Sequence, residues 1–119
     1  RETLSQIEGR CRKLGAELGW EIDFRQSNNE GELVTWVQDA AQAHQAIILN
    51  AGAYTHTSIA IHDALKAIGV PVIEVHLSNI FQREEFRHTS YISNLADGVI
   101  CGFGSIGYEL ALRTLGAKN

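Results

Sequence analysis

The stretch that most constrains the fold is an apolar run over residues 46–49 that ends abruptly at Asn50. Its isoleucines and leucine follow one another without polar alternation, which predicts a strand buried on both faces, as in a parallel sheet. Small and polar residues follow as far as His56, and then Thr57 or Ser58 is placed to cap a helix. A strand, a polar loop and a helix N-terminus in this order are a common place for a ligand site in a parallel α/β sheet.

The rest of the chain repeats the alternation of strands and helices that such a sheet requires. Apolar residues at three- and four-residue spacing predict helices with apolar faces over residues 4–18, 33–41, 59–68 and 105–115. Besides residues 46–49, strands are predicted over residues 20–24, 72–76 and 97–101. The first of these alternates apolar with polar residues, as a half-exposed edge strand does. The predicted fold is a doubly wound parallel sheet with right-handed crossovers.

Length, charge and hydropathy exclude several classes of function. The 119 residues make one domain, large enough to bury a core, with no linker or internal repeat. The formal net charge of −4, without a cluster of Lys or Arg, argues against a nucleic-acid partner. No apolar run approaches the ~18 residues of a membrane span, and no signal peptide is recognised. Cys11 and Cys101 lie within apolar patterns, so we expect a reduced, cytoplasmic protein.

Polar residues and glycines follow three of the predicted strands, at the sheet edge where ligands bind in this architecture. They are Asn50, then His76 with Leu77 and Ser78, and then residues 102–104. Asn, Ser and Gly also favour ordinary turns, and for Ser78 and Gly102 taken alone that interpretation is preferred. Several polar strand ends that converge on one edge nevertheless predict a site there.

Glu74 and His76 lie two residues apart, on one face of a strand that should be buried. An unpaired buried carboxylate is costly, whereas a carboxylate beside an imidazole orients the ring and favours its charged form. A core ion pair without a chemical role is the less favoured alternative. The five histidines lack the spacing of a zinc site. His56 differs from the others because it closes the loop after the central strand.

Arg83 and Arg87 lie four residues apart, on one face of a short helix or turn. They form either a solvated amphipathic turn or a cover over a ligand rich in carboxylate or hydroxyl groups, and spacing alone leaves both interpretations open. Residues 102–107 fit a glycine pattern of dinucleotide sites. They follow the last strand and lack the acidic partner of such sites, so no dinucleotide is expected.

Four segments, residues 50–58, 71–79, 83–93 and 98–104, together resemble type II 3-dehydroquinate dehydratase, and residues 26–32 fit as well. The resemblance extends from Thr3 to Leu115. It implies a flavodoxin-like fold of three layers, α/β/α, for one domain over residues 1–119. It also implies dehydration of 3-dehydroquinate to 3-dehydroshikimate in the shikimate pathway of aromatic amino acid biosynthesis. The reaction passes through an enolate and needs no metal and no cofactor.

The resemblance also assigns residues to roles in this reaction. His56 matches the acid that protonates the departing hydroxyl, with help from Asn50 and Glu74. His76 and Arg87 match residues that bind ring hydroxyls. Polar groups placed where charge develops, and a proton donor near the leaving oxygen, are what enolate chemistry requires.

Further matched positions concern the substrate carboxylate, the lid and assembly. Leu77 and Ser78 match residues that hold the carboxylate through backbone and hydroxyl groups, and Arg83 matches a residue near the lid. Asp63 matches a residue that reaches the site of a neighbouring subunit. The family forms trimers that assemble into dodecamers, so self-association is expected besides the small-molecule substrate.

The resemblance is incomplete at the front. In the family an upstream strand and a glycine-rich lid carry an asparagine, an arginine and the tyrosine that acts as base. That strand would be central, between residues 20–24 and 46–49, and Tyr54, Tyr91 and Tyr108 do not match the base. We therefore expect an N-terminally incomplete copy that is inactive alone. The alternatives are a non-catalytic flavodoxin-like binding or assembly module and, less favoured, a flavin- or phosphate-binding protein.

Overall fold

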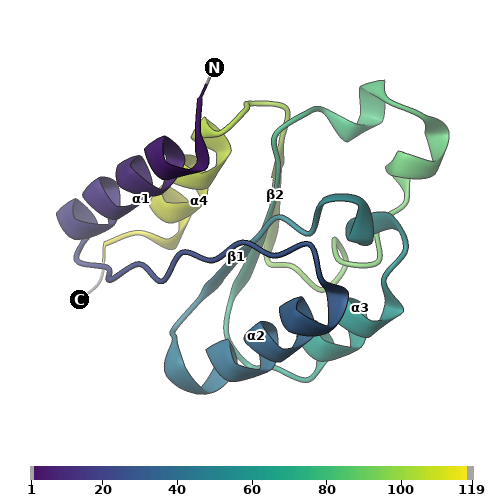
Figure 1. The fold of residues 1–119 in the computed structure, drawn as a ribbon, viewed down its shortest axis with the longest axis horizontal. Coiled ribbons are helices and arrows are strands. Elements are labelled where there is room, and N and C mark those ends of the chain that lie inside the picture. The colour runs from purple at the N-terminus through teal and green to yellow at the C-terminus, as the bar shows by residue number, and fades with distance from the viewer. Residues whose placement is uncertain (1, 118–119) are drawn as a thin grey trace.

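The structure, a computed structural model, describes residues 2–117 and arranges them in three layers (Figure 1). A parallel sheet lies between two pairs of helices, with α1 and α4 on one face and α2 and α3 on the other. The helices are α1 (Leu4–Leu18), α2 (Glu30–Ala43), α3 (Ile59–Lys66) and α4 (Ile106–Leu115). The strands are β1 (Ile47–Leu49), β2 (Val72–His76) and β3 (Gly98–Cys101). Short 3₁₀ helices lie at η1 (Gly52–His56), η2 (Ile80–Gln82) and η3 (Glu85–His88).

The helices begin and end where local chemistry predicts. Thr3 and Gln6 form a reciprocal capping box at the start of α1, and Gly19 ends that helix with a φ of 83°. Ser58, one of the two predicted caps, accepts a hydrogen bond from the backbone N–H of Ile61 at 2.9 Å. This cap fixes the direction in which the chain leaves the loop after β1.

The sheet has the order β1-β2-β3, with both pairs parallel. The central strand β2 is buried along its whole length, and Glu74 pairs with Leu49 on one side and Val99 on the other. The prediction that β1 is buried on both faces is only partly correct, because Ile47 and Ile48 are half-buried. Among residues 2–117, β1 has a strand neighbour on one side alone.

The strand predicted over residues 20–24 is not formed, so three of the four predicted strands are present in residues 2–117. The alternation of half-buried with exposed side chains persists, and Ile22 and Phe24 pack on the apolar face of α1. A strand needs a neighbour for its backbone hydrogen bonds. Here a hollow of about 1330 Å³, lined by residues from both segments, lies between residues 20–28 and β1.

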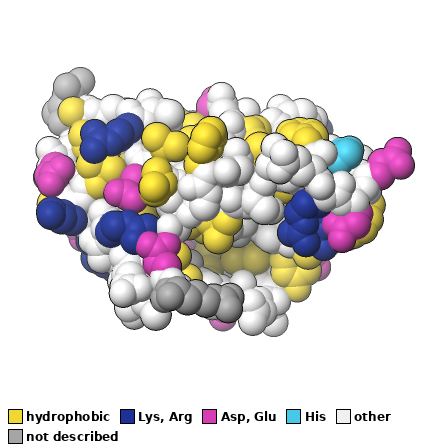
Figure 2. Space-filling view, turned by 90° about the horizontal axis from the view of Figure 1, so that it is seen from above, with side chains coloured by type: hydrophobic (Ala, Val, Ile, Leu, Met, Phe, Trp, Pro, Cys, Tyr) yellow, Lys and Arg dark blue, Asp and Glu magenta, His cyan; other side chains and the backbone are white. Residues whose placement is uncertain are grey.

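Figure 2 shows the face at the carboxyl ends of the strands, with apolar side chains exposed within a hollowed area. Charged side chains of both signs lie on both flanks of this face, and those on the right lie over the η2 and η3 segment. The core lies on both faces of the sheet. On the α2 and α3 side, Ile61, Leu65 and Ile92 pack with Leu49. Apolar side chains therefore pack on both faces of the sheet beside the edge that carries the predicted site.

Candidate active site

Glu74 and His76 form a buried pair at the carboxyl end of β2. Their side chains point to the same face of the strand, and His76 Nε2 lies 2.5 Å from Glu74 Oε2. Glu74 is fully buried and His76 is 5% exposed. Burial alone would raise the pKa of Glu74, but hydrogen bonds from His76 and Ser93 outweigh it and hold this pKa below its usual range. The carboxylate is therefore ionised and orients the imidazole.

Two serines complete the coordination of the Glu74 carboxylate. Ser93 Oγ donates to Oε1 at 2.6 Å, and Ser90 Oγ donates to Oε2 at 3.4 Å. Sequence analysis gave neither serine a role, although both lie in a segment that carries the family resemblance. A hydroxyl in a turn is too common a feature to single them out.

His56, at the end of η1, lies beside this pair. Its ring stacks on that of His76 with centroids 6.3 Å apart and an interplanar angle of 20°. His56 Nδ1 lies 2.7 Å from the carbonyl oxygen of Thr89. Since a carbonyl only accepts, Nδ1 carries a proton in this contact, and within residues 2–117 Nε2 has no hydrogen-bond partner. The structure thus brings His56, which the sequence placed on a separate segment, beside Glu74 and His76.

Asn50 follows β1 and holds its amide between two partners. Its Oδ1 accepts from the backbone N–H of Gly52 at 3.0 Å, and its Nδ2 donates to the hydroxyl of Tyr108 at 2.9 Å. Gly52 has a φ of 58°, a conformation that favours glycine at this turn. Burial raises the pKa of Tyr108, so its phenol stays neutral. Tyr108 is a contact of Asn50 that sequence analysis did not predict.

Leu77 and Ser78 follow directly after His76 and are exposed. The carbonyl oxygen of Leu77 accepts from the N–H of Gly104 at 2.8 Å, which joins the turns after β2 and β3. Gly102 has a φ of 94°, and a Cβ there would lie 3.3 Å from the Cβ of Asn79. The strand ends predicted to converge are therefore close together.

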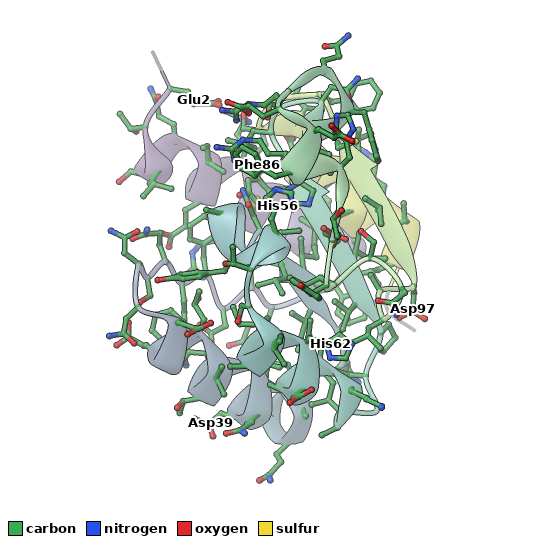
Figure 3. The ribbon with its side chains drawn as sticks, turned by 90° about the vertical axis from the view of Figure 1, so that its right-hand side faces the viewer. Glu2, Asp39, His56, His62, Phe86 and Asp97 are labelled. Atoms are coloured by element: carbon green, nitrogen blue, oxygen red, sulfur yellow. The ribbon has the colours of Figure 1, made fainter. Side chains whose placement is uncertain are left out.

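Arg83 and Arg87 both face Glu84. Arg87 Nε donates to Glu84 Oε2 at 2.7 Å, and Arg83 Nε lies 3.8 Å from the same oxygen. The guanidinium of Arg87 also lies over the ring of Phe86, 4.9 Å from its centroid. In Figure 3, Phe86 and His56 lie at the same end of the molecule, the end where the strands finish.

Asp63 lies apart from the other candidate residues of this chain. It lies on α3 with its side chain 71% exposed, and its carboxylate contacts Nδ1 of His62 at 3.2 Å. His62 lies well away from His56, toward the opposite end of the strands (Figure 3). Asp63 is therefore free to face another molecule.

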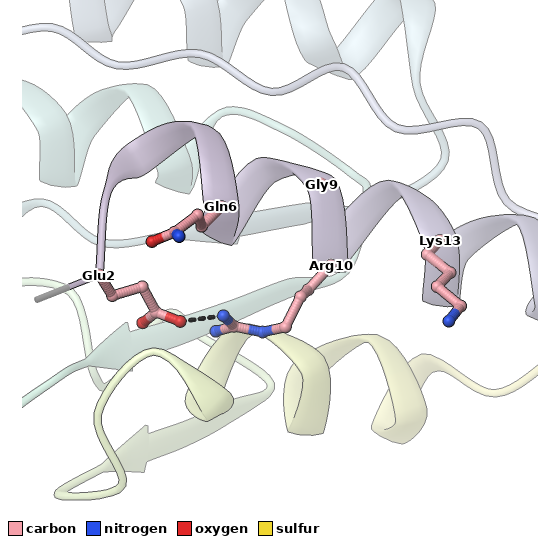
Figure 4. A pocket seen from close by; sticks show the side chains of 5 residues that line it. All are labelled: Glu2, Gln6, Gly9, Arg10 and Lys13. Atoms are coloured by element: carbon pink, nitrogen blue, oxygen red, sulfur yellow. Dashed lines mark hydrogen bonds and ion pairs between the residues drawn. The ribbon is translucent and has the colours of Figure 1, made fainter.

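A second depression lies beside α1, where Arg10 reaches toward α4, and is lined by Glu2, Gln6, Gly9, Arg10 and Lys13 (Figure 4). Arg10 ion-pairs with Glu2 and, at 3.1 Å, with Glu109. Because the carboxylates already neutralise the arginine, this depression is a weaker candidate for an anionic ligand.

No group of three or more His, Cys, Asp or Glu side chains able to hold a metal ion is found within residues 2–117. Over the same part of the chain, no helix has the length and apolar character needed to cross a bilayer.

The fold and the site define an α/β protein with an acid-base cluster at the carboxyl edge of its sheet. The family model of class II dehydroquinase matches residues 1–116. The 3-dehydroquinate dehydratase 1 of Agrobacterium fabrum is 54% identical over 114 residues, which are 96% of this chain and 79% of that protein. The 3-dehydroquinate dehydratase of Mesorhizobium japonicum is 56% identical over 118 residues, 98% of this chain and 82% of that protein.

Solved structures give the same result. The type II dehydroquinase from Propionibacterium acnes superposes with a TM-score of 0.91 at 42% identity, over 95% of this chain and 78% of that one. The enzyme from Butyrivibrio crossotus has a TM-score of 0.93 at 37% identity, over 96% of this chain and 80% of that one. The chain belongs to the class II dehydroquinase family, and both the predicted resemblance and the flavodoxin-like fold are confirmed.

Proposed function

We propose that the protein dehydrates 3-dehydroquinate to 3-dehydroshikimate in the shikimate pathway. One observation carries the proposal: in a member of this family, a buried Glu74–His76 pair stacks against His56 at the edge of the sheet where ligands bind. The non-catalytic module is not favoured, because relatives more than half identical to this chain are named 3-dehydroquinate dehydratase.

The reaction needs one base and one acid. A base takes a proton from the carbon beside the ketone, and the electron pair of that C–H bond forms the enolate. When the enolate collapses, the carbon–hydroxyl bond breaks, and an acid donates a proton so that the hydroxyl leaves as water. Polar groups at fixed positions stabilise the intermediate charge without reorganisation.

The proton donor is one of the two stacked imidazoles. His56, which sequence analysis chose, has Nδ1 on a backbone carbonyl and Nε2 free. His76 has Nε2 on the Glu74 carboxylate and can donate from Nδ1 when charged. A carboxylate stabilises an imidazolium more than a neutral carbonyl does. The contacts therefore favour His76 as the acid, with His56 binding the departing hydroxyl or the ring beside it.

No tyrosine among residues 2–117 is placed to act as the base. Tyr54 donates its hydroxyl to the carbonyl of Asn28 at 2.9 Å, and Tyr108 contacts Asn50 with a raised pKa that makes it hard to ionise. Tyr91 is exposed and matches no base position. The relatives named above are longer than their match to this chain, so they have residues that could supply a base.

Substrate contacts and assembly are further parts of the proposal. Leu77 and Ser78 would receive the substrate carboxylate, Asn50 a ring hydroxyl, and Arg83 and Arg87 would cover the ligand. We place the activity in the cytoplasm, where Cys11 and Cys101 remain free thiols.

The exposed Asp63 supports assembly into trimers and a dodecamer, with Asp63 completing a neighbouring site. Sedimentation of the full-length natural protein tests this directly. A fully active monomer would contradict it.

The function is tested by adding 3-dehydroquinate to the full-length natural protein and following the conjugated-enone absorbance of the product. The expected result is enzymatic turnover that chelators do not reduce. A protein that binds 3-dehydroquinate but produces no enone would support the non-catalytic module instead.

A further inference from the structure

We propose that Ser93 and Ser90, in the turn before β3, are positioning residues that keep Glu74 ionised and directed at His76. The kinetic part of this proposal rests on the proposed dehydration, whereas its structural part does not. Ser93 Oγ donates to Glu74 Oε1 at 2.6 Å, and Ser90 Oγ reaches Oε2 at 3.4 Å. His76 occupies Oε2 as well, at 2.5 Å. Ser93 is thus the principal donor to one carboxylate oxygen, and His76 the principal donor to the other.

The position of Glu74 leaves the carboxylate dependent on these side chains. Glu74 is fully buried in a strand that pairs on both sides, with apolar Leu49 and Val99 as its neighbours across the ladders. A buried carboxylate without hydrogen-bond donors is costly and takes up a proton instead. A protonated Glu74 would not stabilise a charged imidazole at His76.

The turn that carries the serines is itself fixed in place. Ile92, between them, is fully buried in the cluster that includes Leu49 and Ile61. Ser90 Oγ accepts from the backbone N–H groups of Ile92 and Ser93, each at 3.0 Å. Ser90 therefore shapes the turn and orients Ser93, while Ile92 anchors it to the core.

The same turn also holds His56. The carbonyl of Thr89 receives His56 Nδ1 at 2.7 Å, and the N–H of Tyr91 donates to the carbonyl of Thr55 at 2.9 Å. Residues 89–93 therefore contact both members of the stacked imidazole pair, His56 directly and His76 through Glu74. One short turn sets the relative position of the two candidate acids.

A purely structural role for Ser93 makes a different prediction from a positioning role. The described titratable groups that face Glu74 are His76 and, stacked on His76, His56; β1, β3 and the core turn contribute apolar or neutral groups. Loss of the Ser93 donor removes one of the contacts that lower the pKa of Glu74. Glu74 then takes up its proton at higher pH, so the acidic limb of kcat/KM moves to higher pH.

The experiment compares Ser93→Ala, Ser93→Thr and Ser90→Ala in the full-length natural protein, with the exposed Ser5→Ala as control. Ser93→Ala should lower kcat about 10-fold, the equivalent of one hydrogen bond to a charged group, and move the acidic limb of kcat/KM to higher pH. Ser93→Thr keeps a hydroxyl and should restore both, and Ser90→Ala should give a smaller shift. An unmoved acidic limb in Ser93→Ala, with only a lower Tm, would overturn the proposal.

A second measurement needs no activity. The imidazole NMR signals of His56 and His76 are titrated in the same variants without substrate. The proposal expects the His76 titration to change in Ser93→Ala and to return in Ser93→Thr. Unchanged titration would overturn the positioning role. The His76 titration could also change in Ser93→Ala while the wild-type protein shows no dehydratase activity. That result would support the positioning role and reject the proposed function.

Discussion

The ends of β1 and β2 lie side by side on the same edge of the sheet, yet they differ in completeness. At the end of β2, Glu74 is fully buried and each of its carboxylate oxygens has a donor. At the end of β1, Asn50 borders a hollow of about 1330 Å³, and among residues 2–117 its strand is paired on one side alone. We infer that the acid half of the site, the cluster around Glu74, is complete within residues 2–117, whereas the half beside β1 is open among those residues.

The difference has a simple physical cause. A strand paired on both sides has its backbone groups satisfied and can carry a buried charge if side chains supply the donors. A strand with one free edge leaves backbone groups for another partner. The following predictions test this contrast, from the largest expected effect to the smallest.

Because the half of the site beside β1 is open among residues 2–117, we expect residues 1–119 alone to have little activity. Residues 1–119 expressed alone should turn over 3-dehydroquinate ~10²–10⁴-fold more slowly than the full-length natural protein, because a positioned base is worth that factor and no tyrosine among residues 2–117 is placed as one. The measurement is enone formation by a preparation whose mass excludes any additional peptide. Equal turnover rates for the two proteins would contradict the difference between the two strand ends, because the β1 side would then be complete in residues 1–119.

A substitution at Arg87 tests whether the η2 and η3 segment belongs to the acid half of the site. Arg87→Ala should raise KM for 3-dehydroquinate by about 10-fold or more, as expected for loss of a charged contact to an anion, and should leave Tm nearly unchanged. Arg113→Ala, an exposed arginine on α4, is the matched control for loss of one surface charge. A lower Tm with unchanged KM would make Arg87 a structural residue.

Stability should depend on pH through Glu74. In the folded protein the pKa of Glu74 lies below its ordinary value of 4.5. The ionised carboxylate therefore contributes its full stabilisation at pH values well above 4.5, and this stabilisation is lost as the pH falls through the lowered pKa. Glu74→Gln should remove this part of the acid dependence and lower the free energy of unfolding at pH 7 by about 1–3 kcal/mol. Urea unfolding at several pH values measures both. Parallel curves for the two proteins would show that Glu74 is not held as an anion.

Tyr108 gives the smallest expected effect, on the β1 side. Tyr108→Phe keeps the ring and removes only the hydroxyl that receives Asn50 Nδ2, so kcat/KM should fall about 2- to 10-fold. The exposed Tyr91→Phe is the control. If Tyr108 acts through Asn50, adding Tyr108→Phe to the Asn50→Ala variant should cause no further loss of kcat/KM. Additive effects would contradict that coupling.

The sequence predicted the elements whose signals are local. The face of α1 containing Ile7, Cys11 and Leu14 could be identified because helical periodicity and a capping box are written in consecutive residues. The pair of Glu74 and His76 was predictable for the same reason, since residues two apart in a strand share a face.

Contacts that depend on tertiary packing could not be predicted in this way. The alternation at residues 20–24 predicted a strand, but strand formation also requires a partner, which the local pattern does not specify. Ser93 reaches Glu74 across 19 residues, and Tyr108 reaches Asn50 across 58. Neither contact has a spacing signal in a single sequence.

The most direct test of the central claim is the turnover of His76→Ala beside that of His56→Ala in the full-length natural protein. Both should fold, and His76→Ala should lower kcat by ~10²–10⁴, the worth of a general acid, with a smaller loss for His56→Ala. A larger loss for His56→Ala would move the proton donor to His56 and keep the acid half at this edge. Near-normal kcat in both variants would contradict the claim that the buried cluster at the end of β2 supplies the acid.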